Sequence, residues 1–260
     1  MANPLAPVAS IGRATIATLA ATGSVALFAG RAIAAAAGPP VYLGQLGRQL
    51  LRVGYFSLPV VGLTAIFTGA SLALNIYTGG VQLNAEQFVP NIVVIGITRE
   101  LGPVLAALML AGRVSAGIAA EIGTMRVTEQ IDALSTLSTN PYKYLIAPRI
   151  VAGVLALPAI VIVADIIGVM GGFVVATQTL GFNGATYVQS TLNFMTTSDV
   201  VTGLVKAAVF GFLLTLMGCY HGYTSRGGAQ GVGRATTNAV VSSAILIFAS
   251  NYILTTLFVE

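Results

Sequence analysis

Five long stretches of apolar residues, separated by short polar or charged segments, dominate this sequence. They cover residues 53–78, 88–112, 150–178, 200–220 and 235–259. A bilayer core about 30 Å thick is spanned by roughly 20 helical residues, so each stretch is long enough for one transmembrane helix. The apolar positions are continuous rather than alternating, which favours helices over a membrane β-barrel. The pattern predicts an all-α integral membrane protein with five spans.

Composition agrees with a membrane location. The 260 residues include 12 Lys/Arg and 8 Asp/Glu, so 8% are charged, and 56% are hydrophobic. A soluble domain carries roughly a quarter charged residues. The single cysteine, Cys219, excludes an internal disulfide. We expect one membrane domain at 53–260, preceded by an N-terminal region at 1–52, and no separate soluble domain.

Basic residues between the spans lie on one side. The segments 1–52, 113–149 and 221–234 contain ten Lys and Arg residues, whereas the opposite segments carry only Glu86, Asp199 and Glu260. Cytoplasmic loops are enriched in Lys and Arg. The sequence therefore predicts a cytoplasmic N-terminus and a C-terminus on the outer side. The net charge of +4 is then explained by basic residues on the cytoplasmic side of the membrane, and we expect no nucleic-acid partner.

Residues 8–37 allow two interpretations. The segment resembles a signal peptide with its cleavage site, because Arg13 is followed by an Ala/Thr-rich run and then by AIAAAA. However, threonines interrupt the run, and Arg31 lies just before the candidate site. We therefore favour a helix lying in the inner membrane interface, with its arginines at anionic headgroups.

The chain lacks the motifs of an enzyme. It contains no Gly-x-x-x-x-Gly-Lys-Ser/Thr loop for ATP, no Gly-x-Ser-x-Gly elbow and no His-Glu-x-x-His. His221 is the only histidine, so a metal site or catalytic triad has too few members. We expect no catalytic residue, metal or cofactor, which leaves transport or a structural membrane role.

Four charged residues, Arg99, Glu100, Asp165 and Lys206, lie within the predicted spans. Each costs roughly 2.5–3.5 kcal/mol at a helix centre, so such groups face a cavity or one another and often mark function. Pro103 has no N–H for the Arg99 carbonyl and predicts a kink there. The alternatives are a structural salt-bridge network that includes Asp165, and a Lys206 side chain that extends to the outer interface.

Two asparagines, Asn75 and Asn251, add polar groups to the charge-free spans. They are expected to bind a ligand or to hydrogen-bond across helices, the latter being the commoner role.

The segment between the second and third spans is too long for a simple connection. Residues 116–137 place apolar side chains at helical spacing, and the residue before Pro141 is pushed out of the helical region. An amphipathic cytoplasmic helix suits the docking of an external ATPase. A helix resting on the membrane surface is the other interpretation.

Four motifs resemble the MlaE/YrbE family of permeases, the transmembrane subunits of ABC transporters that work with MCE proteins in lipid traffic. They are RELGPVLAALMLAGR (99–113), AEIGTMRVTEQIDAL (120–134), NPYKYLIAPR (140–149) and GRATTNAVV (233–241). Together with the predicted order of the spans, these motifs extend the resemblance over the chain from about residue 45 onward.

The resemblance implies a homodimer in the bacterial inner membrane that moves phospholipid between the inner and outer membranes and maintains outer-membrane lipid asymmetry. The implied partners are a cytoplasmic ATPase that binds ATP and Mg, a periplasmic MCE-domain protein and, in some relatives, a STAS-domain protein. Segment 120–134 corresponds to the coupling helix. Its residues implied to contact the ATPase are Glu121, Met125, Arg126, Glu129, Gln130 and Asp132. The lipid is expected at Leu72, Asn75, Ile76, Arg99, Glu100, Lys206 and Asn251.

Two other functions remain open at this stage. The intramembrane charges also suit an ion- or proton-coupled secondary transporter or channel, although the spans show no internal repeat of the kind such carriers often have. The chain is alternatively a membrane scaffold for its partner that transports nothing itself.

Overall fold

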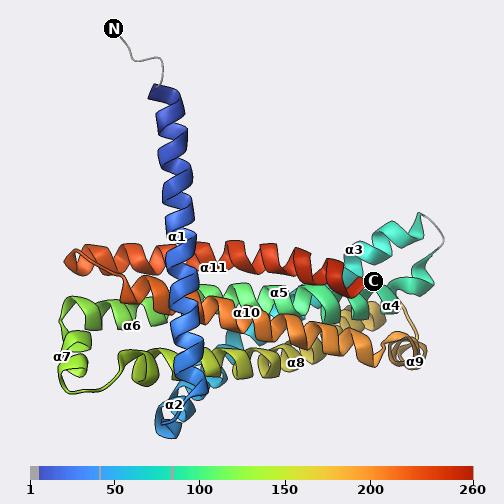
Figure 1. Cartoon of the computed structure of the whole chain (residues 1–260). Helices are drawn as coiled ribbons and strands as arrows, with labels where there is room; N and C mark the ends of the chain where they lie inside the picture. Colours follow the sequence, from blue (N-terminus) through green and yellow to red (C-terminus); the bar gives the residue numbers. More distant parts are fainter. Residues whose placement is uncertain (1–5, 41, 83–84, 260) are drawn as a thin grey trace.

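The computed structural model describes residues 6–40, 42–82 and 85–259 and is helical, without strands, over those ranges. Residues 1–5 and Glu260, both included in the predictions above, lie outside them. Long helices run side by side in a bundle, and one long helix lies across it (Figure 1). The α-helices are α1 (Ala6–Ala37), α2 (Leu43–Val53), α3 (Leu58–Val81), α4 (Val89–Ile95), α5 (Gly102–Leu110), α6 (Ala116–Val127), α7 (Gln130–Thr136), α8 (Ala147–Gln178), α9 (Gly184–Phe194), α10 (Thr197–Tyr223) and α11 (Gly228–Val259).

The second predicted span is longer than its apolar stretch. Helices α4, α5 and α6 are joined by π-helical segments at Gly96–Leu101 and Ala111–Ser115, so one helical rod runs from Val89 to Val127. The helix therefore continues past Arg113, where the sequence predicted that the span ends and a cytoplasmic segment begins. The sequence becomes less hydrophobic at Arg113, but the backbone stays helical because α6 packs against α10 and α11.

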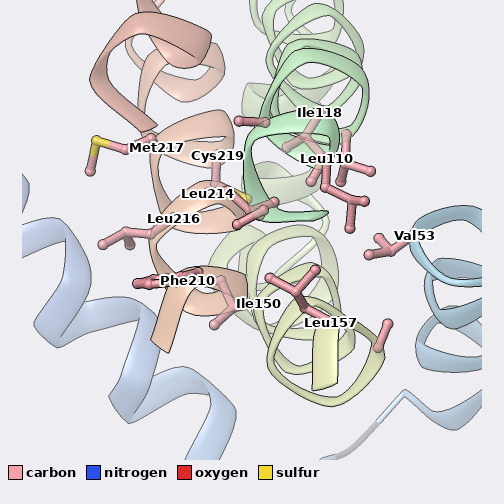
Figure 2. Packing of buried hydrophobic residues seen from close by; sticks show 14 of the residues in the cluster. Val53, Leu110, Ile118, Ile150, Leu157, Phe210, Leu214, Leu216, Met217 and Cys219 are labelled. Atoms are coloured by element: carbon pink, nitrogen blue, oxygen red, sulfur yellow. The ribbon is translucent and has the colours of Figure 1, made fainter. Parts of the chain in front are cut away.

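Helix α10 occupies the centre of the bundle and packs against α6, α8 and α11, while α3 packs against the other side of α8. Figure 2 shows the core between α8, α10 and the α5–α6 rod, where Leu157, Phe210 and Leu214 are fully buried. Burial of such side chains contributes about 1.5–3 kcal/mol each relative to exposure to water. The corresponding outer faces of α3 and α11 are exposed and apolar, as a lipid-facing surface requires.

Close contact between α3 and α8 depends on two glycines. A Cβ added at Gly69 would collide with the carbonyl group of Gly168. Small residues at such crossings allow membrane helices to pack backbone to backbone.

The two ends of the bundle differ in charge. The basic end carries α2, α7 and the connection between α10 and α11, with Arg48, Arg52, Arg126 and Arg226 among its residues. The α9 end carries α9 and the connection between α3 and α4 (Figure 1). This segregation follows the distribution of basic residues predicted from the sequence.

Six helical stretches are long and apolar enough to cross a membrane, one more than the five predicted from the pattern. The additional one is Thr15–Ala37 in α1, whose alanines and threonines gave a weaker apolar signal. Helix α1 nevertheless lies across the bundle rather than along it (Figure 1). Its Phe28 packs against Tyr142, Tyr220 and Tyr223 near the basic end.

The predicted amphipathic helix at 116–137 is in fact divided. Helix α6 ends at Val127, Glu129 adopts a left-handed conformation with φ 60°, and α7 begins at Gln130. A single continuous helix was therefore wrong, because the left-handed residue turns the chain between two helices that both contribute buried isoleucines to the core.

The α3–α8 contact predicts a position-dependent effect of glycine substitution. We expect Gly69→Ala to destabilise the fold by about 1–3 kcal/mol, because the added methyl group forces two backbones apart. Gly79→Ala, in the same helix but with nothing within 4 Å of the added Cβ, serves as the matched control. Thermal unfolding in detergent measures both; equal Tm values for the two variants would contradict the packing argument.

Candidate functional site

The charged pair Arg99 and Glu100 lies in the π-helical segment Gly96–Leu101, directly before Pro103. Proline has no N–H, so the Arg99 carbonyl lacks the usual donor four residues later. A π-helical turn within an α-helix is rare and often marks a functional site. At the predicted kink the helix is locally widened, and the Arg99 carbonyl lacks the donor that residue 103 would supply in a regular α-helix.

Lys206 of α10 supplies that donor. A Cβ at Gly203, one turn earlier on α10, would collide with the Thr98 carbonyl, so the two helices touch at this point. The Lys206 ammonium donates to the Arg99 carbonyl at 3.0 Å and to Glu100 Oε1 at 2.7 Å. Its third hydrogen bond, at 2.8 Å, goes to Thr255 Oγ1 of α11. An ammonium has three N–H groups, so all its donors are used.

Helix α11 completes the arrangement around Glu100. Asn251 Nδ2 donates to Glu100 Oε2 at 3.0 Å, and Thr255 Oγ1 lies 3.1 Å from Glu100 Oε1. The Lys206 side chain is 1% exposed, whereas that of Glu100 is 37% exposed. The Lys206 ammonium is therefore enclosed by its partners, whereas the Glu100 carboxylate is accessible; the network is open on the Glu100 side.

Arg99 points to a different partner. Its guanidinium lies 3.6 Å from Asp199 Oδ1 at the start of α10. The other carboxylate oxygen of Asp199 accepts from the backbone N–H and hydroxyl of Thr196, which caps the helix. Arg99 and Glu100 thus face different partners, because adjacent residues of a helix point in different directions. The two pairs, Arg99 with Asp199 and Lys206 with Glu100, together carry no net charge.

A family model described as Permease MlaE matches residues 46–257. The chain belongs to the MlaE permease family. This confirms the resemblance found in the sequence motifs.

Individual relatives agree with this assignment. A probable ABC transporter permease protein of Rickettsia felis is 54% identical over 249 residues, covering 96% of both chains. A probable ABC transporter permease protein of Synechocystis is 40% identical over 206 residues, covering 79% of this chain and 78% of the relative. The Arabidopsis thaliana protein TRIGALACTOSYLDIACYLGLYCEROL 1, chloroplastic, is 32% identical over 237 residues, covering 91% of this chain and 68% of that protein. The chain is thus an ABC transporter permease and a multi-pass membrane protein.

The structure departs from two of the alternatives considered for the intramembrane charges of this MlaE-family permease. Lys206 does not extend to an interface, because the contact at Gly203 buries it against Glu100. Asp165 joins no ion pair within the described ranges, and its Oδ1 has no hydrogen-bond partner there. Asp165 instead packs against Gly102, where an added Cβ would collide with its carboxylate. The acid that joins the network is Asp199, which the sequence placed in an outer loop.

The other residues expected at the lipid are divided between two places. Asn251 lies in the network, whereas Asn75 donates to the Ser71 carbonyl of its own helix at 2.9 Å and does not meet Asn251. Leu72 and Ile76 are half-buried and pack against a small apolar cluster that includes Ile97. Sequence reasoning missed Thr255, because one more threonine in an apolar helix gives no signal of its own.

The predicted coupling residues lie at the basic end. Glu121 of α6 is held by Arg52 and Arg149, each at 3.1 Å, and Arg126 pairs with Asp132 at 2.6 Å. Met125 packs against the hydrophobic core. Glu129 and Gln130, at the turn into α7, are exposed. The exposed turn, with Asp132 of α7 beside it, is accessible to another protein.

The Lys206–Glu100 pair predicts strong energetic coupling. We expect Glu100→Gln to destabilise the protein by about 3 kcal/mol, because it leaves a buried ammonium without its counter-charge. Lys206→Met should cost less, because Glu100 is partly exposed and keeps Asn251 and Thr255. Chemical unfolding in detergent, with Lys143→Met as a control at the basic end, measures these effects. A double variant Glu100→Gln, Lys206→Met should lose less stability than the sum of the single variants; strict additivity would contradict the pairing.

Proposed function

We propose that this permease moves phospholipid in an ATP-driven ABC transporter, together with an MCE-domain protein, and so contributes to lipid traffic between the inner and outer membranes. The observation that carries the proposal is the network of two ion pairs inside the bundle, open on the Glu100 side and flanked by exposed apolar helices. The Arabidopsis relative bears the name of a diacylglycerol lipid, which supports a lipid as the transported species.

A phospholipid suits both parts of this surface. Its phosphate needs cationic donors, and its acyl chains gain about 0.8 kcal/mol for each CH₂ group buried against apolar surface. Large apolar side chains are exposed along α11, including Ile245, Phe248 and Tyr252. Lys206 has no spare donor, whereas Arg99 makes one long ion pair and its side chain is 28% exposed. We infer that Arg99 makes the first contact with the phosphate and that Glu100, Lys206 and Asn251 rearrange afterwards.

The proposal includes a homodimer. Helix α11 packs against α5, α6 and α10 on one side only, and its opposite face is exposed over its length. A second copy that covers this face would enclose the Glu100 side of the network between two protomers. The expected acyl contacts Leu72 and Ile76 lie on α3, where they pack against the apolar cluster of Val89, Val93 and Ile97.

The remaining parts of the proposal follow from membership of an ABC transporter. An ABC permease works with an ATPase, so ATP and Mg are expected on that partner; we include a STAS-domain protein as a further subunit in the proposal. ATP-driven transport replaces the ion-coupled alternative considered from the sequence. We place the protein in the bacterial inner membrane, with the basic end and N-terminus cytoplasmic, the C-terminus periplasmic and α1 in the inner interface.

The transport role is tested at Arg99, which makes one long ion pair and is partly exposed. In liposomes containing the permease, its ATPase and its MCE protein, we expect Arg99→Gln to slow transfer of a fluorescent phospholipid by about tenfold, because a charge-assisted hydrogen bond is lost. Arg226→Gln, on the exposed connection between α10 and α11, is the matched control. Wild-type transfer by Arg99→Gln, with normal folding, would exclude Arg99 from the lipid path.

The coupling role is tested at the exposed turn. We expect Glu129→Arg to reduce co-purification of the ATPase by about tenfold, because an exposed charge at an interface centre is reversed. Arg126→Asp combined with Asp132→Arg keeps the internal ion pair while exchanging its charges, and Glu86→Arg is a control at the α9 end. Unchanged ATPase capture by Glu129→Arg and by the exchanged pair would refute this docking site.

A further inference from the structure

A second cluster of charged side chains lies at the basic end, far from the intramembrane network. Two adjoining cavities of about 290 and 260 Å³ lie between α2, α6 and the start of α8. They share Gln49, Arg52 and Glu121 as walls. Arg113 lines the first cavity, and Arg48 and Arg149 line the second.

The charges of this cluster do not balance. Glu121 is the only acidic side chain in the lining of the two cavities, and it serves both Arg52 and Arg149. Arg113 donates to Ser57 Oγ at 2.7 Å and to the Arg52 carbonyl at 3.2 Å, both of them neutral acceptors. Four arginines therefore face one carboxylate, and the remaining positive charge favours an anion.

One guanidinium also has an unused buried donor. The Arg149 side chain is 4% exposed, and its Nε has no hydrogen-bond partner in the described part of the chain. Leaving a buried donor of a charged group unsatisfied is costly, so an acceptor in the cavity would be stabilising. Gln49, also buried, forms part of both cavity walls. The other three arginines of the lining, Arg48, Arg52 and Arg113, are exposed, so a ligand can reach them from outside the protein.

The surface beside the cavities is apolar. Leu51, Tyr55 and Phe56 follow along α2 and the turn after it, and they are 58%, 65% and 56% exposed. Basic pockets next to apolar surface at a membrane interface bind the headgroups of anionic lipids. An arginine cluster is particularly suited to phosphate because its planar donors form paired hydrogen bonds.

We propose that Arg48, Arg52, Arg113 and Arg149 form a phosphate-binding site at the basic end, separate from the intramembrane network. The neighbouring apolar side chains favour a phospholipid headgroup as the source of the phosphate. A soluble phosphate compound offers the same chemistry without acyl chains. The site does not depend on the proposed transport role, because none of its residues belongs to the network around Lys206.

The test uses the purified full-length permease in nanodiscs and in mild detergent. Native mass spectrometry measures binding of phosphatidylglycerol, and a separate titration measures binding of glycerol phosphate and inorganic phosphate. We expect Arg113→Gln and Arg48→Gln each to weaken phosphatidylglycerol binding by about tenfold, because each removes charge-assisted donors. Arg226→Gln and Arg234→Gln remove the same charge from the same end but lie outside the cavities, and should bind as the wild type does. Arg149 is left unchanged because its burial makes misfolding a risk.

The outcomes separate the possible occupants. Loss of lipid binding in the cavity variants, without competition by soluble phosphates, supports the site with a lipid as its ligand. Competition by glycerol phosphate or inorganic phosphate supports the site with a soluble ligand. Equal binding by wild type, cavity variants and controls would overturn the proposal. It would also be overturned if the cavity variants lost only association with the ATPase, since the arginines would then face a protein.

Discussion

An ammonium group buried in a helix bundle requires three hydrogen-bond acceptors, and the helices around Lys206 are arranged to provide them. One acceptor is the Arg99 carbonyl, which Pro103 leaves without its helical donor. The others are Glu100 on the same rod and Thr255 on α11. Helix α10 must therefore pack against both the rod and α11 for the Lys206 ammonium to keep its three hydrogen bonds. A shift of any of these helices would leave an ionised group unpaired in an apolar setting.

This coupling has a mechanical consequence. The pairs Lys206–Glu100 and Arg99–Asp199 join the rod to α10 near the α9 end, while Glu121 joins α6 to Arg52 and Arg149 at the basic end. The rod from Val89 to Val127 therefore carries one charged junction near each end. A partner that moves the turn at Glu129 acts on the same rod that holds Glu100. One π-helical segment contains Glu100, and the other, Ala111–Ser115, lies between the two junctions; such segments within α-helices are frequent at functional sites.

The two charged regions also differ in what they leave unsatisfied. Around Lys206 every ammonium donor is used, and the access lies on the side of a carboxylate. At the basic end, Glu121 is the one carboxylate in a lining with four arginines and pairs with two of them, and the Arg149 Nε has no partner in the described structure. The charges of the first region balance one another, whereas the second keeps an excess of positive charge.

The sequence alone determined the membrane class, the stretches that form the bundle, the side on which the basic residues gather and the three charged side chains at the centre of the network. These follow from hydrophobicity and spacing, which are local properties of the chain. Only the tertiary structure decided which charges pair. Lys206 is buried rather than interfacial because Gly203 lets α10 touch the rod, Asp199 rather than Asp165 meets Arg99, and α6 continues past Arg113. Each depends on how closely two helices approach, and that distance is set by side chains on both helices at once, which no single stretch of sequence records.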